Sequence, residues 1–144
     1  MNFFKIKNKK IVYLIFIINY FNYITMNYKL GKKNKLKKKN EINKLFKTGK
    51  SYKISFLRII FTKLNNPDKD FNFKCGVIVS KKNIKKSVNR NKIKRILRES
   101  IRLNRKIIQN QKNMIFMLIF ESKKIKNFKE IQIKYLKILK KIIP

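Results

Sequence analysis

Five of the six arginines in this chain lie between residues 87 and 105, whereas lysine supplies the positive charge almost everywhere else. A guanidinium group is planar and carries several fixed N–H donors, so it can bind two phosphate oxygens or two acceptors of a base edge at once. A lysine ammonium group acts only as a point charge. The arginine cluster therefore indicates contact with a phosphate-rich polymer.

A helix over residues 87–105 would separate these side chains into two faces, because an α-helix has about 3.6 residues per turn. One face would carry Ser100 and the apolar residues Val88, Ile93, Ile96, Leu97 and Leu103. The opposite face, about 100° wide, would gather polar and basic residues: Asn91, Lys94, Arg95, Arg98, Arg102 and Arg105. Ser87 is expected to cap the N-terminus of this helix. A charged helix face is usually only solvated, but the arginine content and the single acid, Glu99, favour a polyanion-binding face.

The chain as a whole is also strongly basic. Its 144 residues include 40 Lys and Arg and six Asp and Glu, for a formal net charge of +34 at pH 7. A dense polyanion is the expected partner, and nucleic acid comes first because its phosphates are regularly spaced. Lys, Asn and Ile dominate while Ala, Trp and His are absent, as in AT-rich coding sequences, so the sign of the charge is more informative than its size.

Groups that could catalyse hydrolysis are missing or scattered. There is no histidine, three glycines do not form a phosphate loop, and the only cysteine, Cys75, lies in an apolar run that predicts a buried, inert thiol. The acids fall in different predicted elements: Glu41, Asp68, Asp70, Glu99, Glu121 and Glu130. We therefore expect no catalytic residue and no metal site in the protein, and a partner that carries any reaction.

The spacing of apolar residues predicts the elements that position the arginine helix. We expect a helix over 37–48 that ends at Gly49, followed by one strand or two short strands over 51–63. A turn over 64–70 should then form a hairpin with the next strand, a buried strand over 71–80. A basic loop over 81–86 leads into the arginine helix, a strand follows Asn113, and a final amphipathic helix spans 127–142. The order α-β-β-β-α-β-α predicts an α+β fold in which three helices pack on a small mixed sheet of about four strands.

Strand alternation suggests a second binding surface. Phe56, Arg58 and Ile60 should share one face of the strand over 51–63, and a lone arginine there suggests that this face is open to solvent or ligand. Phe46 and Phe56 could then offer rings on which unpaired bases stack. Both phenylalanines could equally belong to the core, where we expect Phe71, Phe73, Phe116 and Phe120.

Residues 1–26 form a segment separate from a single domain over residues 27–144. Lysines precede the apolar run 11–18, as in a signal peptide, but no small-residue cleavage site follows and the run is too short for a membrane span. We interpret the segment as a dispensable extension or as codons upstream of a start at Met26, with an export or membrane role as the alternative.

Two stretches carry a specific resemblance. Residues 90–99 (RNKIKRILRE), preceded by residues 76–82 (GVIVSKK), resemble the signature of the bacterial ribonuclease P protein component. The family pattern is a strand ending in Val-Ser-Lys-Lys, a short loop, then Arg-Asn-Arg-x-Lys-Arg-x-x-Arg-Glu. A basic arm and a helix ending in x-Leu-Phe-x-x-Gly (Leu45, Phe46, Gly49) agree with it, over about residues 28–142. Lys92 departs from the pattern by replacing an arginine, and Ile42 by replacing an aromatic residue.

The resemblance implies a two-layer sandwich like that of small ribosomal proteins, with an unusual left-handed β-α-β crossover that contains the arginine helix. General rules would have predicted a right-handed crossover. The resemblance also implies that a catalytic RNA performs the hydrolysis with magnesium ions, which are bound mainly by that RNA. The residues that would contact this RNA are Lys81, Lys82, Arg90, Asn91, Lys92, Lys94, Arg95, Arg98 and Arg102. Those that would line a cleft for the single-stranded 5′ leader of precursor tRNA are Phe46, Phe56, Arg58 and Ile60.

The resulting hypothesis is the protein subunit of ribonuclease P, an endoribonuclease that removes the 5′ leader from precursor tRNA. We expect its partners to be the catalytic RNA and precursor tRNA, in the cytoplasm and without stable membrane association. The alternative is a ribosomal or general RNA-binding protein without a processing role, which composition alone would favour.

Overall fold

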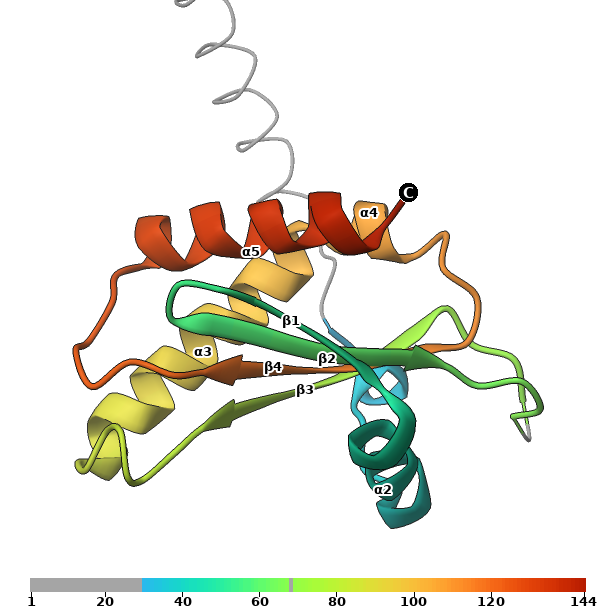
Figure 1. Ribbon diagram of the computed structural model, residues 1–144, viewed down its shortest axis with the longest axis horizontal. Coiled ribbons are helices and arrows are strands. Elements are labelled where there is room, and N and C mark those ends of the chain that lie inside the picture. Colours follow the sequence, from blue (N-terminus) through green and yellow to red (C-terminus); the bar gives the residue numbers. More distant parts are fainter. Residues whose placement is uncertain (1–29, 68) are drawn as a thin grey trace, which may run out of the picture.

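A computed structural model describes residues 30–67 and 69–144 of the chain as a four-stranded sheet with helices on both faces (Figure 1). The elements in chain order are the 3₁₀-helix η1 (Lys32–Asn34), α2 (Lys39–Thr48), β1 (Lys50–Ile54), β2 (Leu57–Lys63), β3 (Phe73–Val79), α3 (Ser87–Leu103), α4 (Arg105–Ile108), β4 (Met114–Phe120) and α5 (Phe128–Ile142). This confirms the predicted α+β class and element order, with the short α4 as an addition. The predictions for residues 1–26 lie outside the described residues.

The four strands lie in the order β1-β2-β4-β3. β2 is antiparallel to both β1 and β4, whereas β3 is parallel to β4. The predicted hairpin through residues 64–70 is therefore wrong, because β4 lies between β2 and β3. Every residue of β4 is apolar, so this strand can be covered on both faces, and it lies between β2 and β3 inside the sheet.

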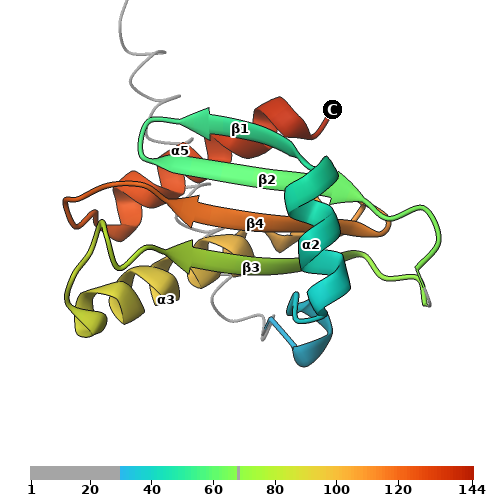
Figure 2. The ribbon, with the colours of Figure 1, turned by 60° about the horizontal axis from the view of Figure 1, so that its bottom comes forward.

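The connection from β3 through α3 and α4 to β4 is left-handed. In Figure 2, β3 and β4 point in the same direction, α2 lies in front of the sheet, and α3 passes behind it. When the view is turned so that both strands point upward, β4 lies to the right of β3 with the connecting helix behind. The crossover is thus the rare hand, as the family resemblance implied.

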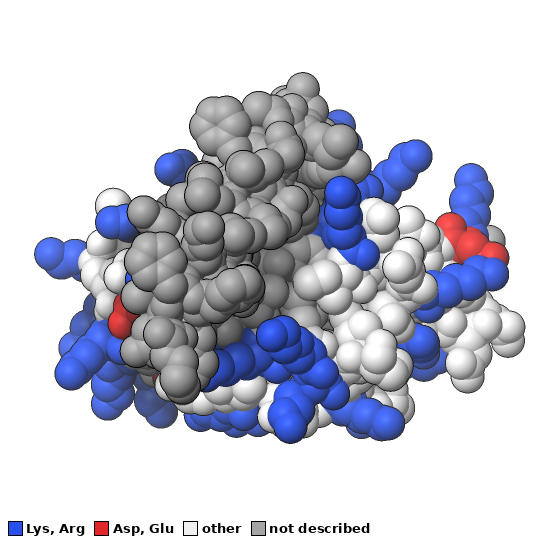
Figure 3. All heavy atoms as spheres, turned by 90° about the horizontal axis from the view of Figure 1, so that it is seen from above, with Lys and Arg blue, Asp and Glu red and all other residues white. Residues whose placement is uncertain are grey.

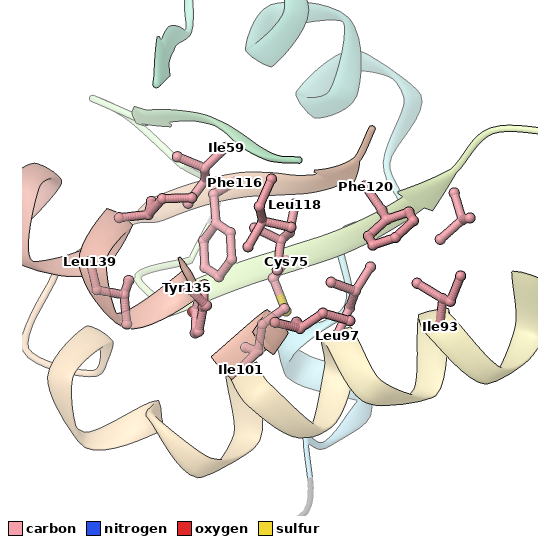
Figure 4. Packing of buried hydrophobic residues seen from close by; sticks show 14 of the residues in the cluster. Ile59, Cys75, Ile93, Leu97, Ile101, Phe116, Leu118, Phe120, Tyr135 and Leu139 are labelled. Atoms are coloured by element: carbon pink, nitrogen blue, oxygen red, sulfur yellow. The ribbon is translucent and has the colours of Figure 1, made fainter. Parts of the chain in front are cut away.

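The larger core lies between the sheet and the pair α3 and α5. Figure 4 shows Ile93, Leu97 and Ile101 of α3 pointing toward the sheet, with Ile93 below Phe120 and the other two below Cys75, and all are buried. A smaller core lies on the opposite face, where α2 packs across one end of the sheet; its buried members are Leu36, Leu45, Ile115 and Met117. The open remainder of that face is available to a ligand.

The basic arm before α2 lies along the free edge of β3. Lys35 forms a parallel bridge with Cys75, the Leu36 amide donates to the Cys75 carbonyl at 3.0 Å, and Asn34 Nδ2 donates to the Phe73 carbonyl at 3.1 Å. These bonds satisfy backbone groups that an edge strand would otherwise leave open to pairing with another chain.

The ends of α3 differ from the prediction. Lys86, not Ser87, occupies the N-cap position, and no side chain caps the helix there. Val88 is 75% exposed instead of buried, because the first turn of the helix extends beyond the sheet. At the other end, Asn104 Nδ2 donates to the Ser100 carbonyl at 2.8 Å and α3 stops at Leu103. Arg105 consequently belongs to α4.

Among residues 30–67 and 69–144, no helix is both long enough and apolar enough to cross a bilayer.

Candidate nucleic-acid interface

One face of α3 carries most of the predicted RNA-binding residues. Asn91, Lys92, Arg95 and Arg98 are exposed and Lys94 is half-buried, on the side away from the core residues of the helix. The helix holds this face in place because its apolar side is anchored in the larger core. The arrangement presents fixed donors to a polyanion without requiring the helix to form on binding.

Arg102 is held by its neighbour one turn earlier. Its Nε donates to Glu99 Oε2 at 2.8 Å, and a second nitrogen donates to Oε1, so the guanidinium binds the carboxylate at two points. The hydrogen bond from Arg102 lowers the pKa of Glu99 below its usual value. The ion pair with Glu99 therefore already uses part of the Arg102 fork.

Arg90 has its own partners, in the loop before α3. Its Nη1 donates to the Ile84 carbonyl at 3.0 Å and to the Lys85 carbonyl at 2.6 Å. The exposed Lys81 and Lys82 belong to the same loop. The structure thus brings these three predicted residues together at the N-terminal end of α3 and gives Arg90 a role in holding the loop.

A groove of about 780 Å³ runs between α3, the arm and the edge of β3. Arg95, Arg98 and Arg102 line one wall, and Lys35 and Lys37 of the arm belong to the opposite wall. Sequence reasoning assigned no binding residue to this arm. The signal was the run of lysines, but only its pairing with Cys75 places it opposite the arginines.

The second predicted surface is the sheet face beside α2. Phe46 on α2 is 49% exposed, while Ile60 packs at the edge of the smaller core. Arg58 is partly exposed on the same face, where its Nε donates to Glu121 Oε1 at 2.7 Å and its Nη1 to Ser51 Oγ at 3.0 Å. The structure therefore places Phe46, Arg58 and Ile60 on one side of the sheet, as predicted.

Phe56 does not share that side. It is buried in the larger core on the opposite face, with its ring centroid 5.6 Å from that of Phe120. Ser55 has a φ of 54°, and this turn between β1 and β2 interrupts the strand alternation on which the prediction relied. The geometry removes Phe56 from the predicted cleft.

Lys53 extends the Arg58 cluster, because its Nζ lies 2.7 Å from the other oxygen of Glu121. Hydrogen bonds from Arg58 and Lys53 lower the pKa of Glu121 below its usual value. Lys53 and Arg58 are partners across the β1–β2 ladder, so one carboxylate holds two cations side by side at the open face.

Two close contacts fix α2 on the sheet. Glu41 Oε1 accepts a hydrogen bond from Lys74 Nζ at 2.9 Å, and both side chains are largely buried. At the other end of the helix, a Cβ atom on Gly49 would lie 2.3 Å from the Leu45 carbonyl oxygen and 2.8 Å from Ile60. Gly49 has a φ of −69°, so the site requires glycine for close approach and not for a left-handed conformation. This position sets the distance between Phe46 and the sheet.

Acidic side chains of the described residues serve the fold. Glu41, Glu99 and Glu121 form the ion pairs above, Asp70 pairs with Lys112, and Glu130 completes the capping box of α5 with Asn127. Within residues 30–67 and 69–144, no three His, Cys, Asp or Glu side chains come together in a way that could hold a metal ion. The residues present do not fit a magnesium site. Burial raises the pKa of the Cys75 thiol to about 12, so it is a poor nucleophile.

The charge distribution fits the binding of a polyanion. Lys and Arg side chains surround the face shown in Figure 3, and acidic ones are few. The described part of the chain thus offers a cationic helix face, a groove beside it and a partly apolar sheet face with an exposed aromatic ring. This combination can hold a nucleic acid through its phosphates and stack an unpaired base.

Comparison with known proteins agrees with this geometry. The family model of ribonuclease P matches residues 30–143. Curated relatives described as ribonuclease P protein component include one from Clostridium novyi (strain NT), 36% identical over 104 residues that cover 72% of this chain and 88% of the relative. A second, from Clostridium botulinum (strain Loch Maree / Type A3), is 34% identical and covers 76% and 95%.

Solved structures with the same fold include the RNase P protein of Staphylococcus aureus, with a TM-score of 0.64, 26% identity and coverage of 77% of this chain and 98% of that one. The RNase P protein from Thermotoga maritima has a TM-score of 0.61 and 28% identity, with coverage of 75% and 96%.

Proposed function

The chain belongs to the ribonuclease P protein family, and from this premise we propose how it takes part in removing the 5′ leader of precursor tRNA. As a protein component of ribonuclease P, its partner is the RNase P RNA. The alternative of a ribosomal or general RNA-binding protein is not favoured by the family match. The proposal concerns the surfaces that meet each RNA and the location of the chemistry.

The RNase P RNA binds the exposed face of α3 and the groove beside it. The observation that carries this proposal is the convergence of Arg95 and Arg98 with the lysines of the arm on one groove about 780 Å³ in volume. Guanidinium forks suit phosphate oxygens and an RNA backbone supplies them in series. Lys92 contributes a point charge where an arginine would contribute a fork, so its contact depends less on geometry.

The 5′ leader of precursor tRNA lies along the open sheet face beside α2. Its unpaired bases have a stacking partner in the exposed ring of Phe46, and its phosphates meet Arg58 and Lys53. Ile60 adds an apolar surface between them. A single strand suits this face because its bases are free to stack on a side chain, whereas those of a duplex are not.

Magnesium ions held mainly by the RNA partner would supply the chemistry of hydrolysis, in the cytoplasm. The acids of the described residues are separated or engaged in ion pairs and a helix cap, which supports a protein that binds and positions. No step of the reaction is assigned to a side chain of this chain.

The test combines the full 144-residue chain with its cognate RNase P RNA and measures cleavage of precursor tRNA at low magnesium. We expect the protein to raise the rate of leader removal, because its cations replace part of the counterion screening that the RNAs need. Arg95→Ala should weaken binding of the RNase P RNA and reduce the dependence of log Kd on log salt by about 0.7–0.9. Cleavage that the protein does not stimulate would overturn the proposal.

A further inference from the structure

A second basic groove lies at the end of the sheet, away from the groove between α3 and the arm. It has a volume of about 460 Å³ and is formed by two loops that are distant in sequence, one between β3 and α3 and the other between β4 and α5. Both loops lie at the same end of the molecule in Figures 1 and 2. Four lysines line it: Lys82, Lys85, Lys86 and Lys123.

The charge of this groove is uncompensated within its walls. The remaining lining residues are Asn83, Ile84, Asn89 and Ile125, so no carboxylate is among them. Like charges that face one another oppose the close approach of the two loops. An arrangement with this cost persists only if other contacts hold the loops in place.

A set of hydrogen bonds holds the first loop rigid. The Ser80 carbonyl accepts from the amides of Asn83 and Ile84 at 3.1 and 3.0 Å, and Ser80 Oγ accepts from the Lys82 amide at 3.1 Å. Ile84 is buried in the larger core. Arg90 reaches back from α3 to the carbonyls of Ile84 and Lys85. The lysines therefore start from a fixed backbone, so that less entropy is lost on binding than in a mobile loop.

We propose that this second groove binds backbone phosphates of the RNase P RNA. Arg90 is a positioning residue, because its hydrogen bonds hold the loop that carries the groove lysines. The proposal rests on the proposed function, since it extends the RNA-binding surface around the N-terminal end of α3 to Lys123 in the β4–α5 loop. RNA is the occupant because four converging cations without an acid fit a chain of phosphates. The exposed Ile125 and the half-buried Asn89 can contact ribose.

The experiment compares two double variants of the full chain. Lys85→Ala/Lys123→Ala removes two cations of the groove. Lys137→Ala/Lys140→Ala removes two exposed lysines of α5, the first of which lies about 15 Å along the helix from its N-cap. Binding of the RNase P RNA alone is measured from about 50 to about 500 mM salt, a range over which counterion release makes the affinity depend on salt. We expect the groove variant to lower the slope of log Kd against log salt by about 1.5 and the α5 variant to leave it unchanged.

The role of Arg90 is tested by a double-mutant cycle. If Arg90 acts through the loop, Arg90→Ala should weaken binding in the unaltered chain and add little to Lys85→Ala/Lys123→Ala. Additive losses would instead make Arg90 an independent RNA contact and overturn its positioning role. The groove variant leaves Arg90 in place, so it remains informative even if Arg90→Ala unfolds.

The outcomes distinguish failure of the proposed function from failure of the groove assignment. If the unaltered chain neither binds the RNase P RNA nor stimulates cleavage, the proposed function fails. If it does both, but the groove and α5 variants have equal salt slopes, only the groove assignment fails. A change of slope that appears only with precursor tRNA would assign the groove to the substrate and would equally overturn it.

Discussion

Replacing Phe46 by alanine gives the sharpest prediction for the leader cleft. The Phe46 side chain is 49% exposed on α2, whereas its neighbour Leu45 is fully buried, so truncation at 46 removes a binding surface with little effect on the core. Stacking of one base on an aromatic ring contributes about 1–3 kcal/mol. This corresponds to about a 5–150-fold increase in Kd for a substrate whose leader reaches the ring.

The assay measures Kd of the assembled ribonucleoprotein for precursor tRNA with a leader and for mature tRNA without one. Phe46→Ala should weaken the first and leave the second unchanged. Ile133→Ala is the matched control, because Ile133 is 44% exposed on α5, which packs on the opposite face of the sheet. Equal losses for the two RNAs, or no loss for either, would refute the assignment of Phe46 to the leader.

Three further predictions concern the supports of the site. Gly49→Ala should lower the free energy of unfolding by about 1–3 kcal/mol, because its Cβ would overlap the Leu45 carbonyl and Ile60; Gly31→Ala, whose Cβ would lie 4.0 Å from the Lys33 backbone nitrogen without overlap, should be neutral in the same denaturant titration. The folded-state pKa of Glu121 is lowered, so its ion pairs stabilise the fold above the carboxyl's ordinary pKa of 4.5 and lose that effect as pH falls through the lowered value. Glu121→Gln should therefore flatten the acid side of the stability profile, and an unaltered profile would contradict the assigned partners. The Cys75 thiol, with its pKa raised to about 12, should resist a thiol reagent at pH 8 and react only after denaturation; rapid reaction of the native chain would show that β3 is not covered as described.

The arginine helix was the part of the site that sequence could predict. Its apolar side follows the helical period from Ile93 to Ile101, and the exposed side then follows from geometry. The central place of β4 could also have been inferred, since a run that is apolar at every position fits a strand covered on both faces. The predicted hairpin between β2 and β3 failed because turn residues at 64–70 indicate a change of direction but not which strand lies alongside.

The remaining features depend on contacts between distant residues. Nothing local to Lys35 indicates that it would pair with Cys75, although that pairing builds one wall of the main groove. In the sequence, Arg90 cannot be told apart from Arg95 and Arg98. In the structure, its hydrogen bonds hold the preceding loop in place. Phe56 was misplaced because one residue with a positive φ, Ser55, resets the alternation of the strand.

In the proposed function, this chain holds two RNAs on two surfaces. The most direct test attaches a cleavage reagent to single cysteines, which is practical because Cys75 is buried. Asn43→Cys lies one helical turn before Phe46, Lys92→Cys lies on the exposed side of α3, and Lys137→Cys on α5 is the control. We predict cuts in the 5′ leader from position 43, cuts in the RNase P RNA from position 92, and few cuts from position 137. Leader cuts from position 92 or 137 without cuts from position 43 would contradict the placement of the leader beside α2.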